Sequence, residues 1–295
     1  MGLFGKVLRL PAVMREVLSL REELHQLEAR MITANSRALY ALRRDMLQQR
    51  AVLSALDDGK PTAGPPPAKL SPIPSLDQAL EELSGMAPGA FPLWRELLDV
   101  GAKTYEGFPD HSCSVGTHEM AAMFRSFLRP YWGGHVLDIG CGPQPVPSYL
   151  RGYPLDLVHG LDPLSSPDDH PFDFVPGLAE LLPWQSGQFD LVVAATSLDH
   201  VLLLDRSLAE VRRVLRPGGR FVVWVAFIPG SQRYDPHRRD IRKVDDYHLF
   251  HLDRDWFLEE LQPYFDVLET FSYDEPYNSC FMCLAPVAGA GGSST

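Results

Sequence analysis

Two glycines and two aspartates lie at a spacing that suits the binding of a ribose-containing ligand. A short apolar run contains Asp138 and leads directly into Gly140, Cys141 and Gly142. Glycines after a strand let the backbone approach a ligand without interference from a Cβ atom. Asp162 ends the next apolar run, twenty residues after Gly142, where a carboxylate can bind both hydroxyls of a ribose. These residues predict a nucleoside site at the carboxyl end of a parallel sheet.

The residues after Gly142 distinguish between two classes of ligand. A dinucleotide-binding turn has a third glycine that packs the following helix close to a pyrophosphate. Here Pro143, Gln144 and Pro145 follow instead. Asp138 directly precedes the turn, where a carboxylate repels phosphate and attracts a cation. A ligand with a ribose and an ammonium group, but without phosphate, fits this turn better.

These segments resemble the motifs of class I S-adenosylmethionine-dependent methyltransferases, over about residues 115–285. The similar segments are VLDIGCG (136–142), HGLDP (159–163), GLAELLPWQSGQFDLVVAATSLDHV (177–201) and VLRPGGRFVVW (214–224). Their order along the chain and their spacing match the family. The resemblance implies an α/β fold: a Rossmann-like seven-stranded sheet of order 3-2-1-4-5-7-6, with S-adenosylmethionine as cofactor.

The resemblance also implies roles for individual residues. Asp138, Gly140 and Gly142 would line the methionine moiety and ribose, and Asp162 would bind the ribose hydroxyls. The adenine would lie along Leu178 and Ala179, and Thr196 would lie beside the donor. This sequence lacks the polar residue that the family often has near Leu178, and Gln144 replaces the third glycine.

Candidate groups for the acceptor side follow the fourth and fifth apolar runs. They are Asp199, His200 and His248, and a histidine here could remove a proton from a hydroxyl as a general base. For His200, a structural role as a hydrogen-bonding residue at the start of a helix is an equal alternative to the role of a base. We expect His251 to be structural. Cys280 and Cys283 form one isolated C-x-x-C pair, so we expect no metal site.

The elements that must position these groups follow from the pattern of apolar residues. Unalternated apolar runs at 135–141, 155–162, 189–198 and 220–227 are separated by helical patterns, which predicts a parallel sheet covered on both faces. Helices are predicted over about 75–84, 91–103, 117–128, 205–215 and 253–262. The chain then closes with two β-rich stretches, 265–273 and 277–285, which predict an antiparallel hairpin.

The N-terminal part predicts a separate helical extension. Apolar residues recur at 3-4 spacing from Leu10 to Ala41, which is typical of a coiled-coil seam. We therefore expect a homo-oligomer formed through this helix. The alternatives are an amphipathic helix on its own domain, and docking to an anionic membrane surface or to a partner enzyme.

The expected domain boundaries are a coiled-coil helix over 1–58, a proline-rich linker over 59–74, a methyltransferase domain over 75–286 whose residues 75–130 form a helical lid region, and a disordered tail over 287–295.

Composition narrows the function further. The 295-residue chain is 45% apolar and has a net charge of −11, which disfavours binding to nucleic acid. It contains no apolar stretch long enough to span a bilayer and only four cysteines, so we expect a cytoplasmic protein, with a peripheral position at the inner face of the membrane as the alternative.

The acceptor is expected to be a small molecule or a glycan. DIGCGPQP together with SLDHV resembles methyltransferases of sugar and polysaccharide pathways, which favours O-methylation of a sugar or glycan-linked hydroxyl. The alternatives are another small-molecule acceptor of the quinone or isoprenoid type, or a noncatalytic interaction protein that presents a methyltransferase-like domain on a coiled coil.

Overall fold

The computed structural model describes Glu23, Gln26, Arg30, Met31 and residues 38–54, 63–108, 113–273 and 278–288. The chain divides into two compact units, residues 1–47 and 48–295. The described residues of the first unit are helical. Most of the predicted coiled-coil seam and most of the tail lie outside the described residues.

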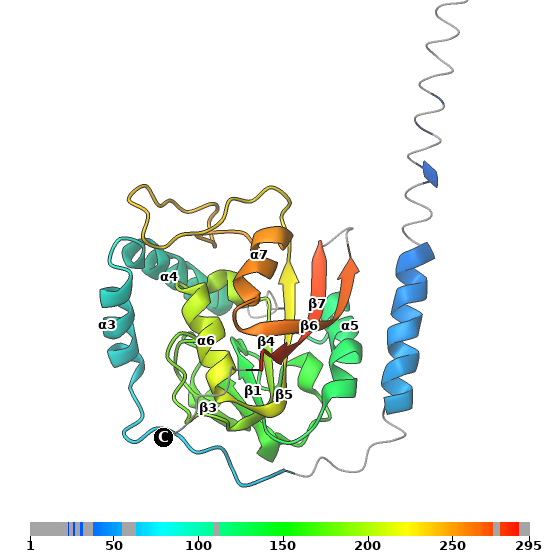
Figure 1. The fold of residues 1–295 in the computed structure, drawn as a ribbon, viewed down its shortest axis with the longest axis horizontal. Coiled ribbons are helices and arrows are strands. Elements are labelled where there is room, and N and C mark those ends of the chain that lie inside the picture. The colour runs from blue at the N-terminus through cyan, green and yellow to red at the C-terminus, as the bar shows by residue number, and fades with distance from the viewer. Residues whose placement is uncertain are drawn as a thin grey trace, which may run out of the picture. The chain divides into compact units, whose positions relative to one another are not determined.

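The second unit contains one seven-stranded sheet (Figure 1). The strands are β1 (Val136–Ile139), β2 (Val158–Leu161), β3 (Asp173–Val175), β4 (Phe189–Ala195), β5 (Leu215–Ala226), β6 (Phe265–Tyr273) and β7 (Ser279–Pro286). Their order is β3-β2-β1-β4-β5-β7-β6. β1 to β5 run parallel, whereas β7 is antiparallel to both of its neighbours. The predicted fold, its strand order and the closing hairpin are therefore confirmed.

Helices cover both faces of the sheet. They are α3 (Leu76–Met86), α4 (Phe91–Gly107), α5 (Glu119–Leu128), α6 (Leu204–Val214) and α7 (Arg254–Leu261). One face of the sheet shares a continuous apolar core with α3, α4, α6 and α7. The other face packs against α5, where Phe124 contacts Trp224 and Phe281. This double coverage explains why the central strands are apolar without alternation.

Two helices begin at side-chain caps that the sequence encodes. Ser75 and Gln78 form a capping box at the start of α3, and Asp253 accepts the Asp255 N–H at the start of α7. Such caps satisfy backbone N–H groups that have no partner within the helix. Local side-chain contacts thus define the residue at which each of these helices begins.

The described part of the proline-rich segment, residues 63–74, pairs with the domain. Ala68 and Leu70 form main-chain hydrogen bonds of 2.9 Å with Gln185 and Pro183, and Lys69 forms an ion pair of 2.5 Å with Asp173 at the start of β3. Prolines keep this segment extended, and an extended segment can add main-chain hydrogen bonds to a neighbour. This part of the linker is therefore anchored along its length.

No helix among the described residues is both long and apolar enough to cross a membrane.

Candidate functional site

A cavity of about 370 Å³ opens at the carboxyl ends of β1, β2 and β4. In open α/β sheets, ligands bind outside the carboxyl ends of the strands, where the strand order reverses. Here the order reverses between β1 and β4. Residues of α4 and residues 247–249 complete the cavity wall. Eight of the ten predicted site residues line this cavity: Gly140, Asp162, Leu178, Ala179, Thr196, Asp199, His200 and His248.

The turn after β1 and the residues after β2 are joined through Asp162. Its Oδ2 accepts the Gly142 N–H at 2.9 Å, and its Oδ1 accepts the Leu164 N–H at 2.7 Å. Gly140 and Gly142 have φ values of 73° and 71°, a conformation that favours glycine. A Cβ atom on Gly140 would also lie 2.5 Å from Cβ of Ser197. Both glycines are thus required by the turn that brings the backbone to the cavity.

Asp138 and Gly142 do not line the cavity. Asp138 is fully buried, and the Tyr149 hydroxyl donates to its carboxylate at 3.1 Å. Burial raises the pKa of Asp138 to about 8; the Tyr149 hydrogen bond opposes this shift and the charge of Asp162 adds to it. Tyr149 itself lines the cavity, so its hydroxyl links the buried Asp138 to the cavity wall. Sequence reasoning missed Tyr149, because its position depends on the short helical turn after the glycines.

The chemistry of these groups fits an S-adenosylmethionine donor. Asp162 is only 5% exposed, and its burial raises its pKa, so hydroxyl donors from a ribose would stabilise its charge. Leu178 and Ala179 offer a buried apolar surface on which a flat base can lie. The buried carboxylate of Asp162 at the cavity wall suits a cationic ligand better than a phosphate. The roles of these residues toward the donor stay predictions.

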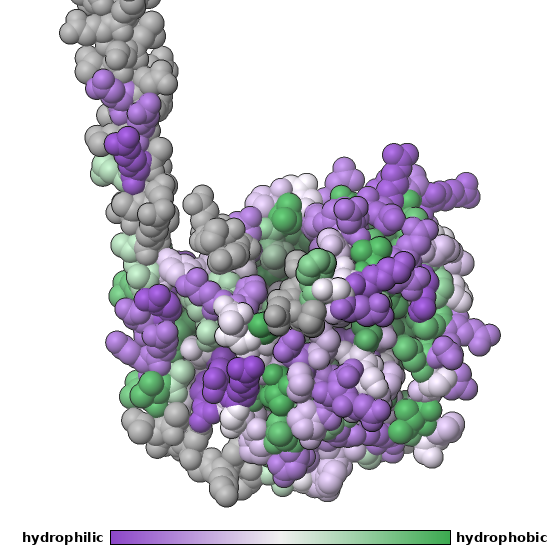
Figure 2. Space-filling view, turned by 180° about the vertical axis from the view of Figure 1, so that it is seen from behind, coloured by the Kyte–Doolittle hydropathy of each residue, from purple (hydrophilic) through white to green (hydrophobic). Residues whose placement is uncertain are grey.

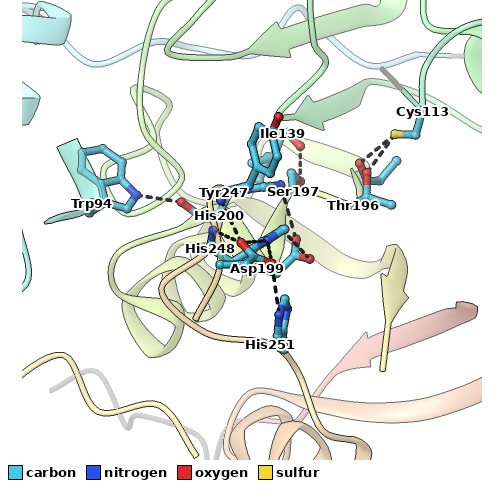
Figure 3. Close-up of polar contacts among 12 residues, drawn as sticks. Trp94, Cys113, Ile139, Thr196, Ser197, Asp199, His200, Tyr247, His248 and His251 are labelled. Carbon is cyan, nitrogen blue, oxygen red and sulfur yellow. Dashed lines mark hydrogen bonds and ion pairs between the residues drawn. The ribbon is translucent and has the colours of Figure 1, made fainter. Parts of the chain in front are cut away.

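Thr196 follows β4 in a strained conformation. Its φ of 53° is unusual for a β-branched residue, and such strain costs on the order of 1–3 kcal/mol. Its N–H donates to the Trp224 carbonyl at 2.8 Å, and its Oγ1 lies 2.9 Å from the Cys113 Sγ (Figure 3). Burial raises the pKa of Cys113 to about 11, so this thiol stays protonated. The two contacts hold the Thr196 side chain at the cavity wall.

The acceptor-side candidates gather as one cluster (Figure 3). The rings of His200 and His248 are stacked, with centroids 4.5 Å apart and planes inclined by 26°. Asp199 lies beside both rings: its oxygens are 4.0 Å from His200 Nε2 and 3.7 Å from His248 Nε2. Trp94 of α4 donates its indole N–H to the His200 carbonyl at 2.7 Å. The structure therefore brings together three residues from two distant loops.

A second carboxylate, that of Asp245, orients His248 through its Nδ1 atom. Asp245 Oδ1 lies 2.9 Å from Nδ1 of His248, and Asp245 Oδ2 lies 3.2 Å from Nε2 of His251. Burial alone would raise the pKa of Asp245, but hydrogen bonds from the Tyr247 N–H and the His248 side chain lower it. A carboxylate on Nδ1 fixes a proton there and leaves Nε2 available as a base. Asp245 was missed from the sequence, where it looked like an ordinary surface acid.

Two overlapping groups could supply ligands to a metal ion. They are Asp199 with His200 and His248, and Asp245 with His248 and His251, and the ligand atoms of each group lie within 4.8 Å of one another. Imidazole and carboxylate together suit a divalent transition metal. The expectation that the protein binds no metal stays a prediction.

Two further residues near the cavity were given no site role by the sequence. The Glu180 carboxylate is 1% exposed and accepts the N–H groups of Leu202 and Leu203 at 2.7 and 3.1 Å. The second is His118, which stands at the N-terminal cap position of α5 but forms no capping hydrogen bond with its side chain. His118 instead lines the cavity, and burial lowers its pKa.

Comparisons with known proteins agree with the fold. Residues 137–223 match the family model of the methyltransferase domain. The ubiquinone/menaquinone biosynthesis C-methyltransferase UbiE of Hahella chejuensis is 47% identical over 138 residues, 47% of this chain and 51% of that protein. The demethylmenaquinone methyltransferase of Symbiobacterium thermophilum is 29% identical over 155 residues, 47% of this chain and 61% of that protein. The chain thus spans less than two thirds of the length of these relatives.

A solved structure is also similar. The 1,6-didemethyltoxoflavin-N1-methyltransferase of Burkholderia thailandensis is 16% identical, with a TM-score of 0.49 over 77% of this chain and 93% of that chain. By its matched family model and its strand order, this chain therefore contains a class I S-adenosylmethionine-dependent methyltransferase domain, as its motifs predicted.

Proposed function

We propose that this protein transfers the methyl group of S-adenosylmethionine to a hydroxyl oxygen of a sugar or glycan-linked acceptor. The observation that carries this proposal is the stacked pair of His200 and His248, with Asp199 beside it, at the wall of the cavity. A hydroxyl is a weak nucleophile until its proton is removed, so a histidine held by carboxylates is the group that this transfer needs.

The donor supplies an electrophilic methyl group on a sulfonium, and the protein's own residues would supply alignment and proton removal. Asp162, Leu178 and Ala179 would hold the nucleoside, and Thr196 would line the path between donor and acceptor. His248 would accept the hydroxyl proton at Nε2, because Asp245 engages its Nδ1. Holding both reactants in line accounts for much of the rate enhancement in such transfers.

A quinone or isoprenoid acceptor is the second candidate. Trp94, Leu97 and Leu98 give the α4 side of the cavity an apolar wall, and the two relatives named above carry quinone methyltransferase names. Apolar walls bind flat rings and hydrocarbon chains as readily as the apolar faces of sugars. Activity screening against sugar nucleotides, cell-surface glycans and demethylated quinones distinguishes the two, and selective methylation of tRNA or protein would contradict both.

Calorimetry with S-adenosylhomocysteine tests the donor site. We expect the Asp162→Ala variant to bind it more weakly by about 1–3 kcal/mol, the scale of buried hydrogen bonds to a charged group. Asp156→Ala is the matched control, because Asp156 is an exposed acid just before β2. A folded wild-type protein that fails to bind the ligand at millimolar concentration would leave the noncatalytic interaction protein as the better explanation.

Turnover by His248→Ala tests the proposed base. We expect a loss of roughly 10²–10⁴-fold, typical of a general base, with the affinity for S-adenosylhomocysteine nearly unchanged. His237→Ala is the control, since His237 is an exposed histidine on the same segment. Loss of donor affinity without loss of turnover would reassign His248 to the donor side.

A further inference from the structure

Residues 233–243 form a cationic segment beside the cavity. It contains five lysine or arginine residues and only two acids, so its charge is +3 in a chain of net charge −11. The five cations are Arg233, Arg238, Arg239, Arg242 and Lys243. All five are exposed. A positive surface of this kind on an acidic protein attracts anions locally.

The five cations divide into two groups. Three form ion pairs: Arg233 with Glu259 and Glu260, Arg238 with Asp240, and Lys243 with Glu96. Arg239 and Arg242 form no ion pair with any residue that the structure describes. The charge of Arg242 acts on nearby Asp240, but neither guanidinium is held in such an ion pair, so both can turn toward a ligand.

The segment is fixed to the cavity walls at both ends. The Tyr234 hydroxyl donates to the Leu202 carbonyl at 3.1 Å, directly after the cavity residue Val201. Lys243 donates to Glu96 of α4 at 2.9 Å, and the Val244 N–H donates to the His248 carbonyl at 2.9 Å. Figure 1 shows this segment arching beside α4, and the corresponding edge in Figure 2 is strongly hydrophilic. The two ends of the segment therefore lie beside the acceptor end of the cavity, and Arg242 is the direct neighbour of Lys243 at one of them.

We propose that Arg239 and Arg242 bind a phosphate or diphosphate group of the acceptor, so that the substrate is a phosphate-activated or phosphate-carried sugar. This inference rests on the proposed function, whose acceptor hydroxyl would lie at His248. A guanidinium presents paired N–H donors that match phosphate oxygens. The acidity of the whole chain disfavours an extended polyanion, whereas a small phosphorylated molecule contacts only the cationic segment.

Calorimetry of the full chain with inorganic pyrophosphate tests this site without the donor or the methyl transfer. We expect Arg239→Gln/Arg242→Gln to weaken pyrophosphate binding by about tenfold or more, because both charge-assisted contacts are lost. Arg233→Gln/Arg238→Gln removes the same charge from the same segment, but from side chains already held by acids. For this control we expect a change of less than about threefold.

Three further measurements separate the outcomes. Unchanged binding of S-adenosylhomocysteine by all variants shows that the fold and the donor site are intact. If the wild-type protein itself does not bind S-adenosylhomocysteine, that result counts against the proposed function alone. Uridine diphosphate glucose should show the same dependence on Arg239 and Arg242 as pyrophosphate. Equal weakening by both double variants, or binding only to phosphatidylglycerol vesicles, would overturn the proposal and leave a diffuse electrostatic surface or a lipid surface instead.

Discussion

Asp138 and Asp162 are buried carboxylates at the ends of two adjacent parallel strands. Burial raises the pKa of both carboxyl groups, and the charge of Asp162 makes Asp138 still harder to ionise. The Tyr149 hydroxyl, which donates to Asp138, opposes this effect. The pKa of Asp138 of about 8 means that the ligand-free protein holds a proton there at neutral pH.

This proton makes stability depend on pH. The pKa of Asp138 is raised from 3.8 in the unfolded chain to about 8 in the folded protein, so its contribution is complete below pH 3.8 and is lost as pH rises through about 8. Within that window the loss is about 1.4 kcal/mol per pH unit. We expect Asp138→Asn to flatten the dependence of Tm on pH between about 5 and 8, relative to the wild type, in thermal unfolding without ligand.

Tyr149→Phe is the companion variant. It removes the hydrogen bond that favours the ionised form of Asp138, so we expect Tm to fall at least as steeply with pH as in the wild type. An Asp138→Asn variant whose curve runs parallel to that of the wild type would show that Asp138 is already ionised in the folded protein.

Among the elements, α6 depends on a side chain from elsewhere in the chain. Its cap residue, Leu203, offers no side-chain hydrogen bond, and the carboxylate of Glu180 accepts the N–H groups of Leu202 and Leu203 instead. A carboxylate at a helix N-terminus also interacts favourably with the helix dipole. Glu180 thus ties the loop after β3 to the helix that follows β4.

We expect Glu180→Ala to lower the free energy of unfolding by about 1–3 kcal/mol, because two buried N–H groups lose their acceptor. Glu180→Gln should cost less, since an amide oxygen can still accept. Urea unfolding measures both, with Glu82→Ala on the exposed face of α3 as control. Equal losses for Ala and Gln would show that the charge, rather than the hydrogen bonds, holds the helix.

The pattern of apolar residues predicted the strands and helices better than it predicted the contacts that individual side chains make between them. Unalternated apolar runs located β1, β2, β4 and β5, because strands buried on both faces need apolar residues throughout. β3 was missed: it has three residues and begins with the exposed Asp173. The left-handed backbone conformation of Thr196 could not be predicted from the sequence either, because a β-branched side chain does not favour a positive φ. Glu180 looks like a surface acid until the tertiary fold encloses it, and Asp245 looks like one until the fold brings it into contact with His248 and His251.

For the molecule as a whole, we propose that the N-terminal helix forms an oligomer. Burial of Val17, Leu20, Leu24 and Leu27 against a second copy would contribute about 1.5–3 kcal/mol for each fully buried side chain. An anionic bilayer would contribute roughly 1 kcal/mol for each cation near its surface. These residues lie outside the described part of the chain, so the self-association is a proposal from the sequence.

Light scattering on the full chain tests this proposal. We expect Leu24→Asp to reduce the mass of the particle toward that of a monomer, because a charge would lie in the seam. Gln26→Asp introduces the same charge away from the seam and should leave the mass unchanged. A wild-type chain that is monomeric at about tens of micromolar, a concentration at which a stable coiled coil associates, would favour a partner helix in another protein.

The cavity becomes more exposed from the donor side to the acceptor side, and this gradient has a kinetic consequence. Asp162, Leu178 and Ala179 are buried, whereas the His200 side chain is 49% exposed and Tyr247 is 42% exposed. An acceptor seated against these outer residues would cover the donor beneath it, so the donor must enter first and its demethylated product must leave last. Steady-state kinetics should therefore show a compulsory order, in which an unreactive acceptor analogue inhibits uncompetitively against S-adenosylmethionine. Intersecting lines in that experiment would instead mean that each ligand reaches its site independently of the other.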